Sequence, residues 1–259
     1  LGPWSVLFAL EIRQAQVAEP NLIPGLQHGP FFPAPVHDPS LRTFTFDNVV
    51  PGSFLPTATM QSGGASIQWF SEVIGEVPNA AETAALIDEA DSSVDTEHLF
   101  FLPYLLGERS PLWESSARGT FTGLARHHTR RHMMRAVMEG VAYNLLTCLL
   151  AFRESGHAID RITAVSGGAQ SDTFLQVLAD VWGIPVYRRS IVDEANSLGA
   201  AVTGAVGLGL TDFSAARSLS EITGEFSPNT GLHASYLKRY ELFTEAVDAL
   251  VPWFQKSQQ

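Results

Sequence analysis

The segment from Arg131 to Glu154 constrains the fold of this chain most, because it is apolar on nearly every side when arranged as a helix. Its large apolar side chains recur at helical spacing, at Met134, Val137, Val141, Leu145, Cys148, Leu149 and Phe152. A helix that is apolar all round must be covered on more than one side. The segment is therefore predicted to be a central core helix, and 259 residues are enough to build a core around it.

Directly after this helix, the pattern changes to a strand, a glycine turn, a second helix and a second strand. We expect the first strand at 162–165, the turn at 166–170, the helix at 173–182 and the second strand at 184–187. Such a unit is typical of an α/β domain.

The first sixty residues have a different pattern, because nine of the fifteen prolines fall there. Short β-prone runs around Leu7, Phe44 and Val49 alternate with Pro and Gly, which predicts strands and loops. The expected helices outside the central unit are one that opens at Gly63 and three at 82–89, 197–208 and 233–254, with a loop-rich bridge at 100–124. Because strands come first and alternating units follow, we expect one α/β domain rather than a simple doubly wound sheet.

An uncharged run, 195–211, contains four glycines. It is shorter than the roughly 20 apolar residues that span a bilayer, so it is predicted to be a buried helix that packs through its glycines. The first ten residues lack the basic segment of a signal peptide. We therefore expect no membrane partner.

The composition argues against several kinds of site. The net charge is -11 and the arginines are scattered, which argues against a nucleic-acid partner. The only lysines, Lys238 and Lys256, lie far from any glycine turn, which excludes a Walker-type phosphate loop. Cys148 is the only cysteine, so a disulfide framework is excluded and a reducing compartment, the cytoplasm, is expected.

Two glycine pairs precede predicted helices. Gly167 and Gly168 follow a strand, where a phosphate or ribose can approach the backbone beside outward-pointing helix amides. Gly64, the second residue of the other pair, stands four residues before Gln68, whose amide is expected to project toward that helix N-terminus. In both cases a turn without a ligand is the alternative interpretation.

Polar features outside the glycine turns carry weaker signals. His128 and His132 have the i, i+4 spacing of a metal pair. No third ligand is spaced convincingly and arginines surround the pair, which favours a solvated basic face. Glu108 and Arg109 either orient a substrate or tie two loops together, and the structural role is favoured.

Several stretches resemble one protein family. Residues 119–124 (GTFTGL) and, after seven residues, 132–139 (HMMRAVME) resemble the second signature of the FGGY carbohydrate kinases. Residues 101–111 and 117–119 are similar to the xylulokinase and gluconokinase branches, and 197–201 to the helix beside the adenine. The resemblance implies the C-terminal, nucleotide-binding domain of that family, with an actin-like, ribonuclease H-like α/β fold in which helices flank a mixed sheet.

The resemblance also implies contacts with ATP. Gly64 and Gln68 fall where the glycerol kinase branch contacts ATP, and Gly168, beside Gly167, falls on its adenosine-loop glycine. Asp172 stands where that branch has Asn, and a carboxylate accepts hydrogen bonds but cannot donate one.

Residues 1–5 (LGPWS) resemble the family's phosphate-contacting turn. Gly2 and Pro3 are therefore expected to lie near the phosphates. Pro3 replaces the usual Thr, which removes a hydroxyl and a backbone N–H from that turn.

The activity implied by the resemblance is ATP-dependent phosphorylation of a sugar hydroxyl, with Mg²⁺ accompanying ATP. A pentulose such as xylulose is the expected sugar, and gluconate is the nearest alternative. The resemblance implies that the family's general-base Asp and sugar-binding residues lie outside residues 1–259, in an N-terminal domain and in the segment just before the phosphate-contacting turn. The whole chain is thus expected to be the nucleotide-binding domain, without a catalytic residue of its own and inactive alone, and the sequence leaves a homodimer open.

Two interpretations of another class stay open. Pro3 and Asp172 are the observations behind a non-catalytic regulatory module derived from a kinase domain. An α/β domain that binds no nucleotide requires the signature match to be a coincidence.

Overall fold

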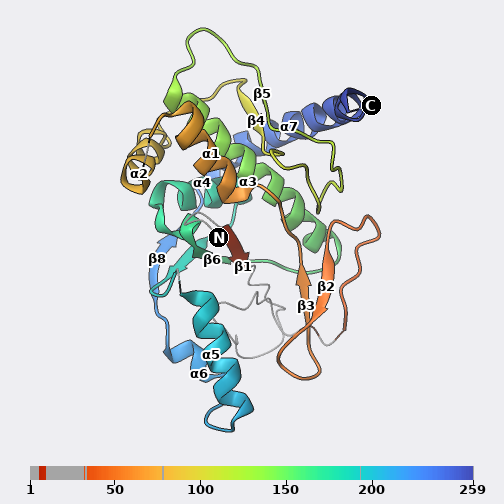
Figure 1. The fold of residues 1–259 in the computed structure, drawn as a ribbon, viewed down its shortest axis with the longest axis vertical. Helices are drawn as coiled ribbons and strands as arrows, with labels where there is room; N and C mark the ends of the chain where they lie inside the picture. Colours follow the sequence, from red (N-terminus) through yellow and green to blue (C-terminus); the bar gives the residue numbers. More distant parts are fainter. Residues whose placement is uncertain (1–5, 10–31, 33, 78, 193, 259) are drawn as a thin grey trace.

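The computed structural model describes residues 6–9, 32, 34–77, 79–192 and 194–258 (Figure 1). The strands are β1 (Val6–Ala9), β2 (Phe44–Asp47), β3 (Phe54–Thr57), β4 (Phe100–Leu102), β5 (Thr120–Thr122), β6 (Ile162–Ser166), β7 (Val186–Arg189) and β8 (Ile222–Phe226). The helices are α1 (Gly63–Trp69), continued by the π-helical turn η1 (Phe70–Ile74), α2 (Ala80–Glu89), α3 (Arg130–Glu154), the 3₁₀ turn η2 (Gly167–Gln170), α4 (Asp172–Trp182), α5 (Ala195–Gly207), α6 (Ala215–Ser218) and α7 (Thr230–Ser257).

The main sheet is mixed, as expected. Its strand order is β1-β6-β7-β8, with β6 and β7 parallel and both outer pairs antiparallel. The parallel pair is joined through η2 and α4, which is the predicted strand, glycine turn, helix and strand unit. The other described strands form two antiparallel pairs, β2 with β3 and β4 with β5.

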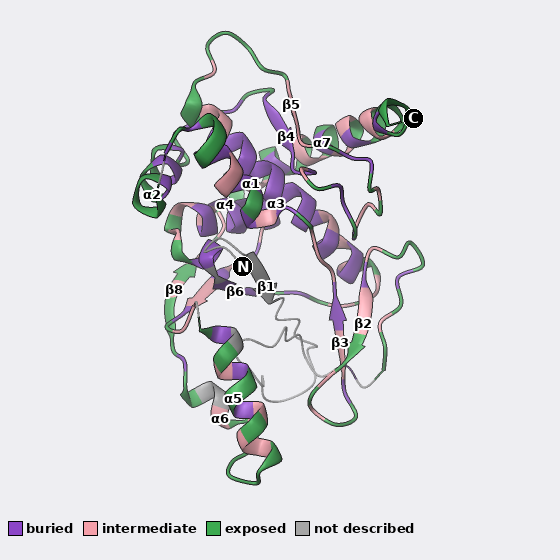
Figure 2. Ribbon diagram, viewed as in Figure 1, coloured by how far each residue is buried: buried purple, intermediate pink, exposed green. Residues whose placement is uncertain are grey.

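Helix α3 is the centre of the core, which confirms the prediction from its all-round apolar pattern. It is buried along most of its length, and α1, α2, α4, α7 and β4 all pack against it (Figure 2). At Gly140 it crosses β4 so closely that a Cβ atom would lie 2.0 Å from the Phe101 carbonyl oxygen. The crossing therefore requires glycine at this position.

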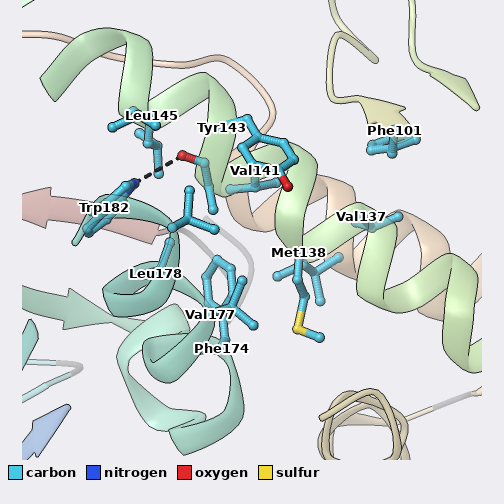
Figure 3. Close-up of a cluster of buried hydrophobic side chains, with 14 of the residues drawn as sticks. Phe101, Val137, Met138, Val141, Tyr143, Leu145, Phe174, Val177, Leu178 and Trp182 are labelled. Carbon is cyan, nitrogen blue, oxygen red and sulfur yellow. Dashed lines mark hydrogen bonds between the residues drawn. The ribbon is translucent and has the colours of Figure 1, made fainter. Parts of the chain in front are cut away.

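The contact between α3 and α4 joins the core to the main sheet. Phe174, Val177 and Leu178 of α4 face the Val141 side of α3 (Figure 3). The Trp182 indole Nε1 donates a hydrogen bond of 3.0 Å to the Ala142 carbonyl. The end of α4 is thus fixed to the middle of α3.

Helix α7 is held to α3 by a buried cluster of charges. Glu139 of α3 accepts hydrogen bonds from Arg135 Nε at 2.8 Å and from Arg239 Nη2 of α7 at 3.0 Å. Tyr236 of α7 accepts from Arg135 Nη2 at 2.6 Å. Because a buried ion needs partners, this cluster specifies how α7 docks on the core.

Within the part of the chain that the structure describes, one helix is long and apolar enough to span a membrane by length and composition, and it is α3. The apolar window within it is 83% buried inside the protein. Its hydropathy is accounted for by the core.

The structure corrects four details of the sequence analysis. Val49 and Val50 lie in the turn between β2 and β3, because that turn brings the two strands together as a hairpin. The strand expected at 184–187 begins two residues later, where pairing with β6 begins. The bridge 100–124 is bounded by the paired strands β4 and β5.

The fourth correction concerns 195–211. Helix α5 is only partly buried, and a Cβ at Gly204 or Gly207 would meet no atom within 4 Å, so these two glycines do not serve close packing in the described structure. The sequence analysis also missed β8. Its largely exposed pattern lacks the apolar alternation of a half-buried strand, and it forms the β7 side of the sheet by backbone pairing.

Candidate functional site

The glycine turn after β6 is the first part of the candidate site. Gly167 and Gly168 are both buried in η2, at the end of β6 and directly before α4. Ser171 caps α4, because its Oγ accepts the Phe174 amide at 3.1 Å. The glycine pair predicted this turn, and the structure places it at the carboxyl end of β6, an inner strand of the main sheet, where α4 begins.

Asp172 is the first residue of α4, where a helix N-terminus favours negative charge. Its Oδ1 accepts from Arg188 Nη1 of β7 at 2.5 Å, while its side chain remains 71% exposed. The Arg188 guanidinium also lies 5.6 Å from the centre of the Phe226 ring. The arginine partner was missed in the sequence analysis, since only the parallel pairing of β6 with β7 brings residue 188 beside the glycine turn.

The start of α1 is the second part of the candidate site. Gly64 is buried. Ser62, at the N-cap position of α1, is fully buried and makes no capping hydrogen bond, because its Oγ has no hydrogen-bond partner. A Cβ added at Gly63 would lie 3.3 Å from Met60 Sδ, so the backbone here is closely approached. A buried hydroxyl without a hydrogen-bond partner is costly, so the start of α1 carries an unsatisfied polar group.

Gln68 takes a different orientation from the expected one. Its Nε2 donates to Glu72 Oε1 at 2.8 Å, one turn further along toward the helix C-terminus. The sequence analysis expected the amide to project toward the helix N-terminus. The i, i+4 neighbour provides a local acceptor, so the amide must leave Glu72 to reach a ligand there.

Both parts of the site rest on the same helix. α1 and α4 each pack against α3, which places the two glycine turns on one scaffold (Figure 1). Gly2 and Pro3, the two other residues expected in the site, lie outside the described residues.

A buried carboxylate lies beside the start of α1. Glu108 Oε1 accepts from the Gln61 amide at 2.8 Å and from the Arg109 amide at 2.9 Å. Its Oε2 accepts from Asn144 Nδ2 of α3 at 2.9 Å. Burial raises the pKa of the Glu108 carboxyl to about 7, although these three hydrogen bonds act to lower it. The expected structural role of Glu108 is seen here as a tie between the bridge, α3 and the residue that precedes the cap of α1.

In the structure a carboxylate lies beside the histidine cluster, which the sequence spacing of the histidines did not indicate. Glu97, His127 and His128 bring one ligand atom each within 4.8 Å of one another, and His127 Nε2 lies 3.3 Å from Glu97 Oε2. His128 Nδ1 accepts the Ala125 amide at 2.9 Å, which leaves the proton of the neutral ring on Nε2. Metal binding at Nε2 would need this proton to move to Nδ1, which would break the hydrogen bond from the Ala125 amide, so the geometry does not favour a metal here.

The chain is similar to proteins of one family. The sequence profile described as the FGGY family of carbohydrate kinases, C-terminal domain, matches residues 26–208. A xylulose kinase of Staphylococcus epidermidis is 32% identical over 200 residues, which are 76% of this chain and 40% of that protein. A glycerol kinase of Citrifermentans bemidjiense is 34% identical over 197 residues, which are 74% of this chain and 39% of that protein.

Solved structures show the same likeness. The ligand-bound xylulose kinase of Lactobacillus acidophilus has a TM-score of 0.76 at 27% identity, over 87% of this chain and 46% of that one. The gluconate kinase of the same organism has a TM-score of 0.75 at 27% identity, with the same coverage. The chain thus spans about 40% of the length of the curated relatives that it matches.

Proposed function

Because the chain belongs to the FGGY family of carbohydrate kinases, we propose that it supplies the nucleotide-binding half of an enzyme that transfers a phosphoryl group from ATP to a sugar hydroxyl. The observation that carries this proposal is that the family match, 26–208, spans both glycine turns. Residues 1–259 as a whole would be the C-terminal domain. The sugar-binding residues and the general base would then lie outside residues 1–259, and these residues alone would be inactive.

The nucleotide contacts we propose come from the starts of α1 and α4. Gly64, Gly167 and Gly168 are buried and offer backbone that a ribose or phosphate can approach. Gln68 would contribute its amide after releasing Glu72, and Asp172 an acceptor for a hydroxyl or amine. Gly2 and Pro3 would approach the phosphates.

The residues of the two turns fit an incoming nucleotide better than a resident metal. At the start of α1, the Ser62 hydroxyl is a polar group that has no hydrogen-bond partner within the protein. Asp172, the carboxylate at the start of α4, is already paired with Arg188. We therefore propose that Mg²⁺ accompanies the phosphates, where it would neutralise charge on the transferring group.

For the sugar, we propose a pentulose such as xylulose. The support is the similarity of 101–111 to the xylulokinase branch, together with relatives named xylulose kinase. The gluconate kinase likeness keeps gluconate as the alternative substrate. We place the protein in the cytoplasm, in keeping with Cys148, the single cysteine, which is buried as a free thiol.

One observation favours a second function, a regulatory module that has lost catalysis. Gln68 and Asp172 both have protein partners, Glu72 and Arg188, at the groups that would contact ATP. The two proposals differ in whether nucleotide displaces those partners.

Calorimetric titration with ATP or ADP, each with Mg²⁺, tests the proposal. Weak saturable binding is expected, and Gly168→Ala should weaken it because the added methyl group lies where the ligand approaches. Gly231→Ala, at the exposed start of α7, is the matched control and should bind as the unchanged chain does. An absence of binding at millimolar nucleotide would contradict a nucleotide site.

A further inference from the structure

Glu108 differs from the other carboxylates described above, because it is buried and its hydrogen-bond donors are neutral. Its partners are two backbone amides and one side-chain amide. An ionised carboxylate without a cation gains its stability from such hydrogen bonds, which are roughly twice as strong as neutral ones. The Gln61 backbone amide is therefore held by a hydrogen bond to the ionised Glu108 carboxylate.

Gln61 directly precedes Ser62, which occupies the N-cap position of α1. Fixing the Gln61 amide thus fixes where α1 begins and where the Ser62 hydroxyl and Gly64 lie. On the other side, Glu108 is anchored to α3 through Asn144, whose Oδ1 accepts from the Tyr104 hydroxyl at 3.2 Å. The chain of contacts runs from the core helix to the start of α1.

We propose that Glu108 is a positioning residue of the nucleotide site, whose ionised carboxylate holds the start of α1 in the geometry that receives the nucleotide. This inference rests on the proposed function. Protonation replaces a charge-assisted hydrogen bond to Gln61 with a neutral one, and Asn144 can then turn its amide so that its oxygen accepts the new proton. The affinity of the site for nucleotide therefore depends on pH near neutrality, where Glu108 titrates.

The other titratable and charged groups around Glu108 do not change charge in this range. Burial raises the pKa of Tyr104, in the same segment, and of the Cys148 thiol on α3, so both stay neutral. Arg109, the next residue, stays charged. The Glu114 carbonyl accepts the Glu108 amide, while hydrogen bonds from Ser116 and Gln255 hold the pKa of the Glu114 carboxyl below its usual range.

The experiment compares Glu108→Gln, Glu108→Ala and the unchanged chain by titration with MgADP between pH 6 and pH 8. The Gln variant keeps an oxygen for the Gln61 amide but never carries charge. At pH 8 the unchanged chain is expected to bind about fivefold more tightly than the Gln variant, the ratio between a charge-assisted and a neutral hydrogen bond. At pH 6 the unchanged chain and the Gln variant should bind MgADP with equal affinity. Glu114→Gln, which removes a charge in the same segment, should show the same pH dependence of affinity as the unchanged chain.

Hydrogen exchange of the amides at 61–66 provides a readout that needs no nucleotide. Glu108→Ala should speed exchange there, while Glu114→Gln should not. Parallel pH profiles for the unchanged chain and Glu108→Gln, or unchanged exchange at 61–66 in Glu108→Ala, would overturn the inference. If no variant binds nucleotide but the Ala variant speeds exchange, the proposed function fails and the control of α1 by Glu108 stands.

Discussion

Arg239 of α7 donates to Glu139 of α3 across 3.0 Å, in a contact that joins residues 100 positions apart in the chain. Arg135 binds the other carboxylate oxygen at 2.8 Å, so one buried anion serves two cations. Glu139 also ends the stretch that resembles the family signature. This relationship assigns that residue a role in holding α7, which lies beyond the matched range 26–208.

Glu139→Gln is predicted to lower the free energy of unfolding by about 3 kcal/mol, because it leaves buried Arg135 and half-buried Arg239 sharing a neutral partner. Urea denaturation measures this loss. Glu89→Gln is the matched control, since Glu89 pairs with Arg130 at 3.7 Å on the surface and should cost less than about 1 kcal/mol. Equal losses in the two variants would refute a structural role for the buried cluster.

Gly140→Ala is predicted to destabilise the protein by about 3 kcal/mol, because its Cβ would collide with the Phe101 carbonyl. Gly204→Ala, also within a helix but facing open space, should instead stabilise it by about 0.5 kcal/mol. Thermal and urea unfolding of the two variants should therefore shift in opposite directions. A tolerated alanine at 140 would show that α3 and β4 can separate without loss.

Asp172→Asn is predicted to tighten nucleotide binding about threefold, because an amide can donate as well as accept and the change removes a negative charge facing the ligand. Stability should change by less than about 0.5 kcal/mol, since the Asp172 side chain is 71% exposed. Calorimetric titration with MgADP provides the measurement. Asp160→Asn, an exposed carboxylate with the same charge change, should leave affinity unaltered, and an equal gain there would reduce the effect to net charge.

The raised pKa of Glu108 predicts a pH dependence of stability. The folded carboxyl titrates at about 7 and the unfolded one near 4.5, so the folded state binds the proton more tightly between these values. Stability from this group is full below about pH 4.5 and falls as pH rises to 7, by about 3 kcal/mol in total. The difference in unfolding free energy between the unchanged chain and Glu108→Gln, measured from pH 5 to pH 8, should follow this fall. A difference that stays constant with pH would contradict the raised pKa.

The elements with a strong period were predictable from the sequence. α3 and the unit from β6 to β7 follow from apolar spacing and one glycine pair, and the structure moves their boundaries by only one or two residues. β8 was not predictable, because its side chains are largely exposed and its place depends on pairing with β7.

The candidate site was predictable in part. Glycine pairs before helices indicated both turns, since backbone freedom is visible in residue type. The partners Arg188 and Asn144 were not predictable, because strand register and helix packing bring them to Asp172 and Glu108 from 16 and 36 residues away. The burial that makes Glu108 distinctive is likewise a property of the folded chain alone.

The shared support of α1 and α4 by α3 has a mechanical consequence. The helices that follow the two glycine turns both pack against α3. The core therefore sets the spacing between the turns, and the turns move together. A nucleotide that contacts both turns would bind to one side of a site that is already formed before binding. Any movement that closes the site around the nucleotide would have to come from the part of the protein that faces these turns.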